Sequence, residues 1–384
     1  MNEPTSKKKT LLIFVEYFLP GYKSGGPVHS ISNLLSLLKN QYTIYLVSRD
    51  RDYKDDNPYA GIVTNQWLDR TFYSILYASP RTINSYYFKK LITQTNPDHI
   101  YLNSLFGSMS RILLLISFAH KRKIIIAPRG ELQASALSIK YQKKRLFLAL
   151  LKRIFNSNLI TWHATSKAET EAIKHVFTRP SIKFIPIILA PDTPALLPHR
   201  EEYVKEKGVL RMVFISRIAP VKNLHFLLDL FPKLSVGKIH LSIYGHINDD
   251  RYWKKCNQLI TAYSGPHEIK YQNYLPNGQV PQTLAQNDFF VLPTLGESFG
   301  HAIFESLSIG VPVLISDQTP WRNLSEQLAG SDLPLEGSSW IDAINHYVSM
   351  ENDTYQQYVA GALRVSRAYI DEQQFHESYS HLFS

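Results

Sequence analysis

Short apolar runs alternate with longer segments of helical spacing along this chain, and this alternation most limits what it can fold into. In the first half, the apolar runs cover residues 10–16, 43–48, 99–104, 123–128 and 159–164. Segments with helical spacing separate them, for example 26–40 and 108–123. Strands that alternate with helices predict βαβ units, and therefore a parallel sheet with helices packed on it.

The alternation stops in the middle of the chain and then resumes. Residues 184–208 hold Pro186, Pro191, Pro194 and Pro198, and proline at that density marks a linker. A second set of apolar runs follows at 210–216, 239–245, 268–272, 288–294 and 311–316, with helical patterns at 222–235, 249–263, 279–286, 299–309 and 338–349. The final segment, 352–383, is helical in composition and has no strand after it.

We therefore predict an α/β protein with two Rossmann-like, parallel-sheet domains that face each other across a cleft. A length of 384 residues favours two cores rather than one. The predicted limits are 1–190 for the first domain, 191–208 for the linker, 209–365 for the second domain and 366–384 for a C-terminal segment. Such sheets bind ligands at the C-terminal ends of their strands, so the cleft is the expected site.

The composition restricts the class of partner. A net charge of +10 predicts acidic partners: phosphorylated ligands, anionic lipid or nucleic acid. The sequence has no zinc-finger spacing and no RNP-like aromatic pattern, so nucleic acid is not expected. Cys256 is the single cysteine, which excludes an intrachain disulfide and fits a reducing cytoplasm. No apolar run approaches the ~18–20 residues that cross a bilayer.

Residues 138–155, SIKYQKKRLFLALLKRIF, form a basic segment without an acid. Its apolar residues Phe147, Leu150, Leu151 and Ile154 fall at helical spacing. A basic amphipathic helix can lie in the headgroup region of an anionic leaflet, or it can be a surface helix with a solvated basic side. Both interpretations stay open. On the first, the residues expected to contact the membrane are Lys140, Lys143, Lys144 and Arg145.

Two acids, Glu297 and Glu305, lie in the otherwise small and apolar stretch PTLGESFGHAIFESLSIGVPVLISD at 293–317. The pattern predicts a strand, a glycine turn, a helix that begins near Ser298–Gly300, and a helix end at Gly310. The free N–H groups and the dipole of a helix start bind anions. Glu305 would lie roughly 7.5 Å further along the axis, about the span from a diphosphate to a ribose. A carboxylate there can accept both ribose hydroxyls, and Glu297 would lie on the sugar side of the phosphates.

Positive charge for a diphosphate is expected from FISRIAPVKN at 214–223. The pattern is strand, turn and helix, with Arg217 and Lys222 in the turn and at the helix start. Both would lie at the C-terminal edge of the second sheet, where arginine can bind two phosphate oxygens and lysine acts as a point charge. The alternative is a pair of solvated loop cations.

Together these motifs resemble the retaining glycosyltransferases of family 4, of the bacterial polysaccharide-biosynthesis type, which use nucleotide sugars and have the GT-B fold. The similarity covers nearly the whole chain. It rests on SRIAPVKN at 216–223, ESFGHAIFE at 297–305 and the glycine-rich YFLPGYKSGGPVHSISNLLSLL at 17–38.

The resemblance implies a role for each motif. Arg217 and Lys222 would hold the diphosphate, Glu297 would contact the donor sugar, and Glu305 would bind the ribose. The further donor-binding residues that it implies are Gly25, Gly26, Ser298, Phe299, Gly300 and His301. It also implies that the C-terminal helix, 366–384, crosses back to the first domain.

The chain departs from the family's pattern at two places. Many relatives carry glycine where this chain has Asn273, in a segment expected near the base. Many carry histidine at the end of a first-domain strand where this chain reads APRGEL. We expect Arg129 to take that catalytic position, although Ala-Pro-Arg-Gly is also a good sequence for a tight turn.

As an activity, the resemblance implies a metal-independent hexosyltransferase without a cofactor. It would move a hexose-type sugar from a UDP- or GDP-linked donor to a lipid-linked glycan acceptor, with retention of configuration, in surface polysaccharide or lipopolysaccharide biosynthesis. Arg217, Lys222 and Glu297 would serve the chemistry, together with Arg129. The expected location is cytoplasmic, with a peripheral position on the anionic inner face of the plasma membrane.

Three alternatives stay open. Asp50-Arg51-Asp52 follows a strand and would suit a metal-dependent, single-sheet glycosyltransferase, whose activity a chelator would abolish. A sugar-nucleotide epimerase has the same two-domain fold and would alter the donor without an acceptor. A non-catalytic protein could bind anionic lipid through residues 138–155, in which case replacing Arg217, Lys222 and Glu297 would leave its function intact.

Overall fold

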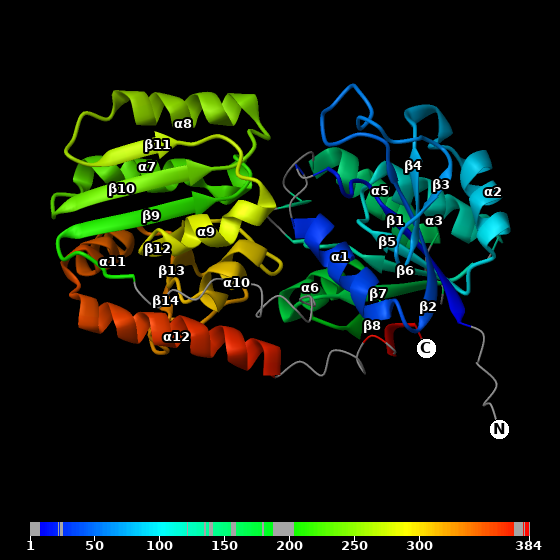
Figure 1. Ribbon diagram of the computed structural model, residues 1–384. Coiled ribbons are helices and arrows are strands. Elements are labelled where there is room, and N and C mark those ends of the chain that lie inside the picture. The colour runs from blue at the N-terminus through cyan, green and yellow to red at the C-terminus, as the bar shows by residue number, and fades with distance from the viewer. Residues whose placement is uncertain are drawn as a thin grey trace. The chain divides into compact units, whose positions relative to one another are not determined.

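The computed structural model describes residues 8–21, 23, 26–120, 122–133, 136–137, 141–154, 159–178, 180–186, 203–371, 379 and 381–383. The chain divides into two compact units, Met1–Ala190 with Gln374–Ser384, and Pro191–Gln373. Each unit contains one sheet flanked by helices (Figure 1). The structure confirms the predicted α/β class with two parallel-sheet domains.

The first sheet has eight strands in the order β3-β4-β2-β1-β5-β6-β7-β8. Their bounds are β1 Lys9–Val15, β2 Tyr42–Arg49, β3 Trp67–Asp69, β4 Ser74–Ala78, β5 His99–Asn103, β6 Ile124–Ala127, β7 Ile160–Ala164 and β8 Ser181–Phe184. Neighbouring strands pair in parallel except β3 and β4, which are antiparallel. The strands β3, β4 and β8 were not predicted from the sequence. The segments WLD of β3 and SIKF of β8 carry too few consecutive apolar residues, whereas β4 contains the apolar run ILYA and was overlooked.

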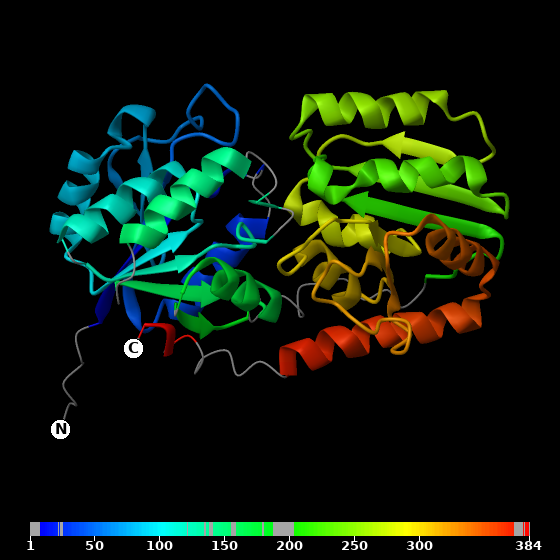
Figure 2. The same cartoon turned by 180° about the vertical axis from the view of Figure 1, so that it is seen from behind.

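Helices cover the two faces of this sheet and bury a separate core on each (Figures 1 and 2). Their bounds are α1 Gly26–Leu38, α2 Ser85–Thr95, α3 Ser108–His120, α5 Tyr141–Ile154 and α6 Lys167–Val176, with a 3-10 turn η1 at Pro80–Thr82. Residues of α2, α3, α5 and α6 share one core, and α1 contributes to the other. The segments predicted as helical at 26–40 and 108–123 correspond to α1 and α3.

The end of the chain belongs to the first unit. Tyr379, Leu382 and Phe383 are buried in the core beneath α1, where the ring of Phe383 lies 5.4 Å from that of Tyr42. The helix before them, α12 (Asn352–Asp371), belongs to the second unit and contacts α10 (His301–Ser308). The limit drawn at residue 365 from the sequence therefore falls inside α12.

The second sheet has six parallel strands in the order β11-β10-β9-β12-β13-β14. Their bounds are β9 Val209–Ile215, β10 Lys238–Tyr244, β11 Glu268–Tyr271, β12 Phe289–Leu292, β13 Val313–Ser316 and β14 Gly330–Leu333. The five predicted runs correspond to β9 to β13, and β14, which reads GSDL, was not predicted because it lacks an apolar run. Its Gly330 packs against the backbone of Val313, where no Cβ would fit.

The other helical elements of the second unit are η3 Pro220–Lys222, α7 Leu224–Leu230, η4 Phe231–Lys233, α8 Asp250–Ala262, η5 Asn277–Gln279, α9 Val280–Ala285 and α11 Gly337–Ser349. The segment predicted as one helix at 222–235 is broken into η3, α7 and η4. Pro232 explains the second break, because its ring removes a backbone N–H and clashes with the preceding turn.

The described end of the predicted linker is packed on the second unit. Lys205 is 2% exposed, and its ammonium donates hydrogen bonds to the carbonyl oxygens of Val209, at 2.9 Å, and Glu206, at 3.2 Å. Residues 203–208 therefore form part of the second unit. Residues 191–202 lie outside the described part of the chain.

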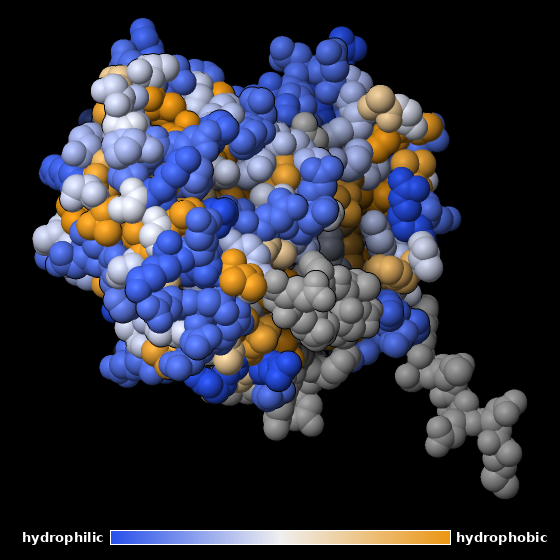
Figure 3. All heavy atoms as spheres, turned by 60° about the vertical axis from the view of Figure 1, so that its left-hand side comes forward, coloured by the Kyte–Doolittle hydropathy of each residue, from blue (hydrophilic) through white to orange (hydrophobic). Residues whose placement is uncertain are grey.

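The surface is mixed in character. On the face shown in Figure 3, hydrophilic side chains predominate and the hydrophobic ones form small groups among them. Among the described residues, none of the helices combines the length and the hydropathy needed to cross a bilayer.

Candidate functional site

The topology of each sheet marks one place for a ligand. In the second sheet the chain moves outward from β9 through β10 to β11 and then returns to place β12 on the other side of β9. In the first sheet it moves outward from β1 to β2 and β4 and returns to place β5 beside β1. Open α/β sheets bind ligands outside the carboxyl ends of the strands at such switch points. The predicted site residues follow β9 and β12.

Hydrogen bonds hold the loops after these two strands together. The backbone N–H of Leu295 donates to the carbonyl of Val221 at 2.7 Å, and the hydroxyl of Thr294 donates to the same oxygen at 3.0 Å. Thr294 is fully buried, and its own carbonyl accepts the Ser316 hydroxyl at 2.6 Å from the end of β13. Three loops from three strand ends are thereby fixed at one edge of the sheet.

Lys222 and Glu297 form an ion pair across this junction. The side chain of Lys222 is 9% exposed and that of Glu297 is 19% exposed, so solvent screens the pair only partly. Both residues were assigned from the sequence to a phosphate and sugar site, and the structure places them in contact. Glu297 is further held by its backbone N–H, which donates to the carbonyl of Gln318 at 3.1 Å.

Arg217 lies two residues beyond the end of β9, at the same edge of the sheet. The neighbouring Ile218 is buried and bonded to the loop after β10, through its N–H to the carbonyl of His246 at 2.9 Å. The Arg217 side chain is half-buried, and no hydrogen bond or ion pair joins it to another residue in the described part of the chain. A half-buried guanidinium without a carboxylate is suited to an anionic ligand.

The helix predicted after β12 is α10, which begins at His301 with Gly300 as its N-cap. Gly300 has φ = 82° and ψ = 68°, a left-handed conformation, and a Cβ there would come within 2.7 Å of the Ile303 side chain. Glycine is therefore required at this turn. Because the first N–H groups of a helix have no acceptor within it, the start of α10 offers donors and a positive dipole end beside Glu297.

The side chain of Phe299 does not face a ligand site. It is 5% exposed and packs against the rings of Trp321, Phe304 and Tyr369. The indole of Trp321 also donates to the carbonyl of Phe299 at 2.6 Å. These contacts fix the turn before α10, so a contact of Phe299 with a donor would have to come from its backbone.

Glu305 is the second acid of this region. It lies four residues after His301, on the half-buried face of α10 that also contains Ala302 and Ser308. Burial raises the pKa of its carboxyl to about 7, and no described residue donates a hydrogen bond or offers a cation to it. A carboxylate held without a partner in a half-buried position is poised to accept hydroxyl groups from a ligand.

The departure at Asn273 has a backbone cause. Asn273 has φ = 62°, the left-handed region that glycine adopts freely and asparagine tolerates better than most residues. Its carbonyl accepts the N–H of Gly245 at 2.9 Å. Asparagine can thus replace glycine here without a change of the turn.

In the first unit, Arg129 occupies a strained turn. Pro128 to Glu131 form a turn closed by a 3.1 Å hydrogen bond, in which Arg129 has φ = 53° and Gly130 has φ = 79°. The alternative interpretation of APRG as a tight turn is therefore correct as far as the backbone is concerned. A non-glycine residue in this conformation costs about 1–3 kcal/mol, so the rest of the fold must impose it.

A chain of hydrogen bonds orients Arg129, and its far end at Tyr101 and His163 is buried. Its Nε donates to Asn103 Oδ1 at 2.7 Å and its Nη2 donates to the Tyr101 hydroxyl at 2.9 Å. His163 bonds Tyr101 through Nδ1 and the carbonyl of Ile185 through Nε2, both at 2.9 Å. Burial, with Arg129 nearby, lowers the pKa of His163 to about 3, so the ring is neutral and its Nε2 donates. Tyr101 therefore donates to Nδ1 and accepts from Arg129.

A cavity of about 310 Å³ lies at the carboxyl ends of β1 and β5. It is lined by Val15, Glu16, Tyr17, Pro27, Asn103, Ser104, Phe106, Gly107 and Glu131. Asn103 is 3% exposed, Arg129 donates to its Oδ1, and in the described part of the chain its Nδ2 has no hydrogen-bond partner. We call this pocket the first-sheet cavity, and one of its lining residues therefore carries a buried donor to which no described residue offers an acceptor.

Glu131 shapes one wall of the first-sheet cavity. It accepts the N–H groups of Leu105 at 2.5 Å and Phe106 at 3.2 Å and the hydroxyl of Ser104 at 2.9 Å. Burial raises the pKa of its carboxyl above the ordinary range, and these bonds oppose the rise. Asn103, Glu16 and Glu131 were not among the site residues predicted from the sequence. The one signal for them is that Glu16 and Asn103 lie at the ends of the predicted strands at 10–16 and 99–104.

The remaining predicted residues fall into two groups. Gly26 begins α1, next to Pro27 of the first-sheet cavity, whereas Gly25 and Lys140 lie outside the described residues. On α5, Lys143 and Arg145 are exposed, but Lys144 folds back to donate to the carbonyl of Ala136 at 2.6 Å.

The apolar stripe of α5 also differs from the prediction. Leu148 and Leu151 are buried, whereas Leu146 is 75% and Leu150 is 55% exposed. Two exposed leucines, one helical turn apart, therefore lie among the basic residues of the outer face.

Asp50 and Asp52, the acids of the alternative metal motif, are both buried and bonded to nearby loop residues. Asp50 pairs with Arg51 at 2.8 Å, and Asp52 accepts the backbone N–H groups of Lys23 and Tyr53. Among the described residues, no group of three or more His, Cys, Asp or Glu side chains is arranged as a metal site.

Comparison with known proteins agrees with this geometry. Residues 198–326, which contain Arg217 and the whole of α10, match the family model "Glycosyl transferases group 1". The chain is 26% identical to the O-antigen chain mannosyltransferase B of Escherichia coli over 275 residues, which cover 68% of this chain and 67% of that protein. These findings support a glycosyltransferase.

Solved structures of similar fold cover nearly the whole chain. One is Anabaena Alr3699/HepE in complex with UDP and glucose, with a TM-score of 0.65 and 17% identity over 97% of this chain and 100% of that one. Another is WaaG, a glycosyltransferase involved in lipopolysaccharide biosynthesis, with a TM-score of 0.66 and 12% identity over 97% and 98%. The fold is therefore GT-B, as predicted, and at these identities the similarity shows the fold alone.

Proposed function

We propose that this glycosyltransferase is a retaining, metal-independent member of family 4. In the proposed reaction it moves a hexose-type sugar from a UDP- or GDP-linked donor to a lipid-linked glycan acceptor in surface polysaccharide biosynthesis. The observation that carries the proposal is the edge of the second sheet after β9 and β12. There the loop after β9, which contains Arg217, lies at the same sheet edge as the start of α10, the helix that contains Glu305. Neither side chain pairs with a described residue.

The donor would bind along α10. Its diphosphate would accept hydrogen bonds from the first N–H groups of the helix and from Arg217, with Lys222 adding charge. Glu305 lies four residues into the helix from His301, roughly 6 Å along the axis, where its carboxylate would accept the ribose hydroxyls. The solved complexes of HepE with UDP and with UDP-glucose support a nucleotide sugar as the ligand of this fold.

In the proposed reaction the bond between the sugar C1 and the diphosphate oxygen breaks, and the bonding electrons leave on the diphosphate. Arg217, Lys222 and the α10 dipole stabilise that charge, so the scheme needs neither a metal nor a cofactor. The acceptor hydroxyl attacks C1 on the face from which the diphosphate departs, and its proton passes to the departing phosphate oxygen. Configuration at C1 is then retained. Glu297 would orient Lys222 and contact the donor sugar.

The acceptor glycan would bind in the first-sheet cavity. The Nδ2 of Asn103 has no acceptor among the described residues and suits a sugar hydroxyl. Arg129, which holds Asn103, is the catalytic candidate of this unit. The E. coli mannosyltransferase similarity supports a surface polysaccharide as the product. Exposed Leu146 and Leu150 among basic residues of α5 support a cytoplasmic protein held on the anionic inner leaflet.

A donor screen tests the proposal. Thermal unfolding of the wild type is measured with UDP- and GDP-sugars, since a ligand that binds the folded state raises its apparent stability. We expect the sugars of one nucleotide, UDP or GDP, to raise the unfolding temperature of the wild type and to leave that of Arg217→Ala unchanged. Stabilisation of both proteins by every nucleotide, or of neither, would overturn the donor site. Incubating the donor without an acceptor and finding a new sugar nucleotide would instead indicate an epimerase.

A further inference from the structure

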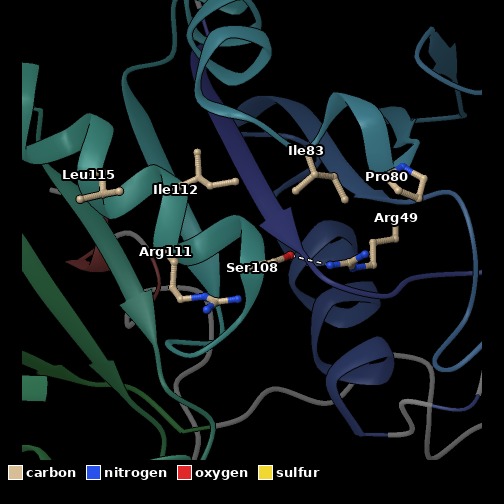
Figure 4. Close-up of a pocket in the computed structure, with 7 residues that line it drawn as sticks. All are labelled: Arg49, Pro80, Ile83, Ser108, Arg111, Ile112 and Leu115. Carbon is tan, nitrogen blue, oxygen red and sulfur yellow. Dashed lines mark hydrogen bonds between the residues drawn. The ribbon is translucent and has the colours of Figure 1, made fainter. Parts of the chain in front are cut away.

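A second cavity of the first unit lies outside the site described above and has an amphipathic lining. Its volume is about 310 Å³, at the lower end of the ~300–1,000 Å³ typical of ligand pockets. Figure 4 shows its polar side chains, Arg49, Ser108 and Arg111, along one side and Pro80, Ile83, Ile112 and Leu115 along the other. We call it the arginine cavity. A ligand that fills it needs an anionic edge and an apolar edge.

The polar side carries more positive charge than the described residues neutralise. Arg49 donates through Nε to Glu16 at 2.8 Å and through Nη2 to Ser108 at 2.5 Å, so Glu16 neutralises it. Arg111 is exposed, and its side chain makes no hydrogen bond or ion pair with a described residue. The described residues that line the cavity include no acid. The two guanidinium groups therefore favour a phosphate, and Arg111 is available to pair with it.

The apolar side continues beyond the cavity along α3. Leu115 is 61% exposed, and Phe118, nearly one helical turn further on, is 48% exposed. Large apolar side chains that continue one another on a surface mark a place where an apolar partner binds. An apolar chain that begins at the arginine cavity would therefore find further contacts along this helix.

The arginine cavity adjoins the first-sheet cavity. Glu16 and Gly107 line the first-sheet cavity, and Arg49 and Ser108 line the arginine cavity. Glu16 bonds both Arg49 and Ser108, and its Oε1 also accepts the N–H of Met109 at 2.8 Å. This cluster is a shared wall, so a phosphate beside Arg111 would lie next to a glycan in the first-sheet cavity.

We infer that the arginine cavity binds the phosphate and the first carbons of the apolar chain of the lipid that carries the acceptor glycan. The inference rests on the proposed function, because it assigns the lipid end of that acceptor to one cavity and its sugar end to the other. The polar side of the cavity binds the phosphate, Ile83 and Ile112 contact the start of the apolar chain, and Leu115 contacts the chain further along α3.

Calorimetric titration with geranyl phosphate, below its aggregation concentration, tests this assignment. We expect binding by the wild type, about tenfold weaker binding by Arg111→Gln, and about threefold or more weaker binding by Leu115→Ser. Both side chains are exposed, so neither change should affect folding. Arg251→Gln, at an exposed arginine on α8 of the other unit, is the matched control and should bind as the wild type does.

Three further probes separate the sources of the phosphate. Geraniol and inorganic phosphate should each bind more weakly than geranyl phosphate, because geraniol lacks the anionic group and inorganic phosphate lacks the apolar chain. Dihexanoyl phosphatidylglycerol should also bind more weakly, and equal binding would assign the cavity to a bilayer lipid and overturn the inference. Binding of geranyl phosphate that is unchanged in both Arg111→Gln and Leu115→Ser would overturn it as well.

Measuring binding of the nucleotide sugar distinguishes a failure of the lipid site from a failure of the proposed function. Arg111→Gln should bind the nucleotide sugar as the wild type does, and should show a raised KM for a lipid-linked acceptor at unchanged kcat. Failure of the wild type to bind any nucleotide sugar would overturn the proposed function. Failure of geranyl phosphate alone would leave the donor site standing and remove only the lipid site.

Discussion

Replacing Glu305 with glutamine should stabilise the protein at pH 8 while it weakens donor binding. Glu305 is half-buried, and no residue in the described part of the chain pairs with it. Burial raises the pKa of its carboxyl from 4.5 to about 7. At pH 8 the folded protein therefore holds a charge that its surroundings disfavour. The unfolded chain has no such penalty.

The sign and the size follow from proton linkage. An acid whose pKa is higher in the folded state binds more protons folded than unfolded, so stability falls as pH rises between the two pKa values. A rise from 4.5 to about 7 corresponds to roughly 3 kcal/mol at pH 8 and about 1 kcal/mol at pH 5. Because Glu305 is partly exposed, solvent screening makes both free energies upper limits. Glutamine is neutral at both pH values and removes the penalty.

Urea unfolding of Glu305→Gln and wild type at pH 5 and pH 8 measures this difference. Glu326→Gln, at an exposed acid of the same unit, is the matched control and should change neither value. In parallel, calorimetric titration should show about 10- to 100-fold weaker donor binding by Glu305→Gln, because an amide accepts the ribose hydroxyls less strongly than a carboxylate does. Equal stabilisation at both pH values, or none at pH 8, would refute the reasoning from burial.

Further predictions concern the loops and the first-sheet cavity. Lys222→Met should lower the free energy of unfolding by about 3 kcal/mol, because it leaves Glu297 without its partner, and adding Glu297→Gln should recover part of this loss in a double-mutant cycle. Gly300→Ala should lower stability by about 1–3 kcal/mol in thermal unfolding, whereas Gly278→Ala, where a Cβ meets nothing within 4 Å, should be neutral. Asn103→Ala should raise the KM for the acceptor at unchanged donor affinity; an unchanged KM would contradict the proposed acceptor site.

Much of the second-unit site could be predicted from the sequence because its determinants are local. Gly300 is needed where the chain turns from β12 into α10, and a run of small and apolar residues fixes the strand and the helix around it. Residues that follow parallel strands collect at one sheet edge. For that reason Lys222 and Glu297, 75 positions apart, could be expected to approach each other.

The strand order and the side-chain contacts could not be predicted in the same way. Nothing in the runs that became β1 and β5 shows that they are neighbours, so the first-sheet cavity and the role of Asn103 were missed. The outward face of α5 was also misjudged, because helical spacing alone does not say which apolar residues meet the rest of the unit. The ring of Phe147 lies 5.7 Å from that of Phe106, whereas Leu150 is 55% exposed.

Local sequence patterns were enough to predict the two α/β units, the glycine turn before α10 and the residue types of the proposed donor site. Each of these depends on residues close together in the chain. The three-dimensional packing was needed to show that Arg129 is held by Asn103 and Tyr101, that Lys144 folds back, and that Arg111 pairs with no described residue. Such contacts join distant segments, and their geometry follows from how whole elements pack rather than from any local pattern.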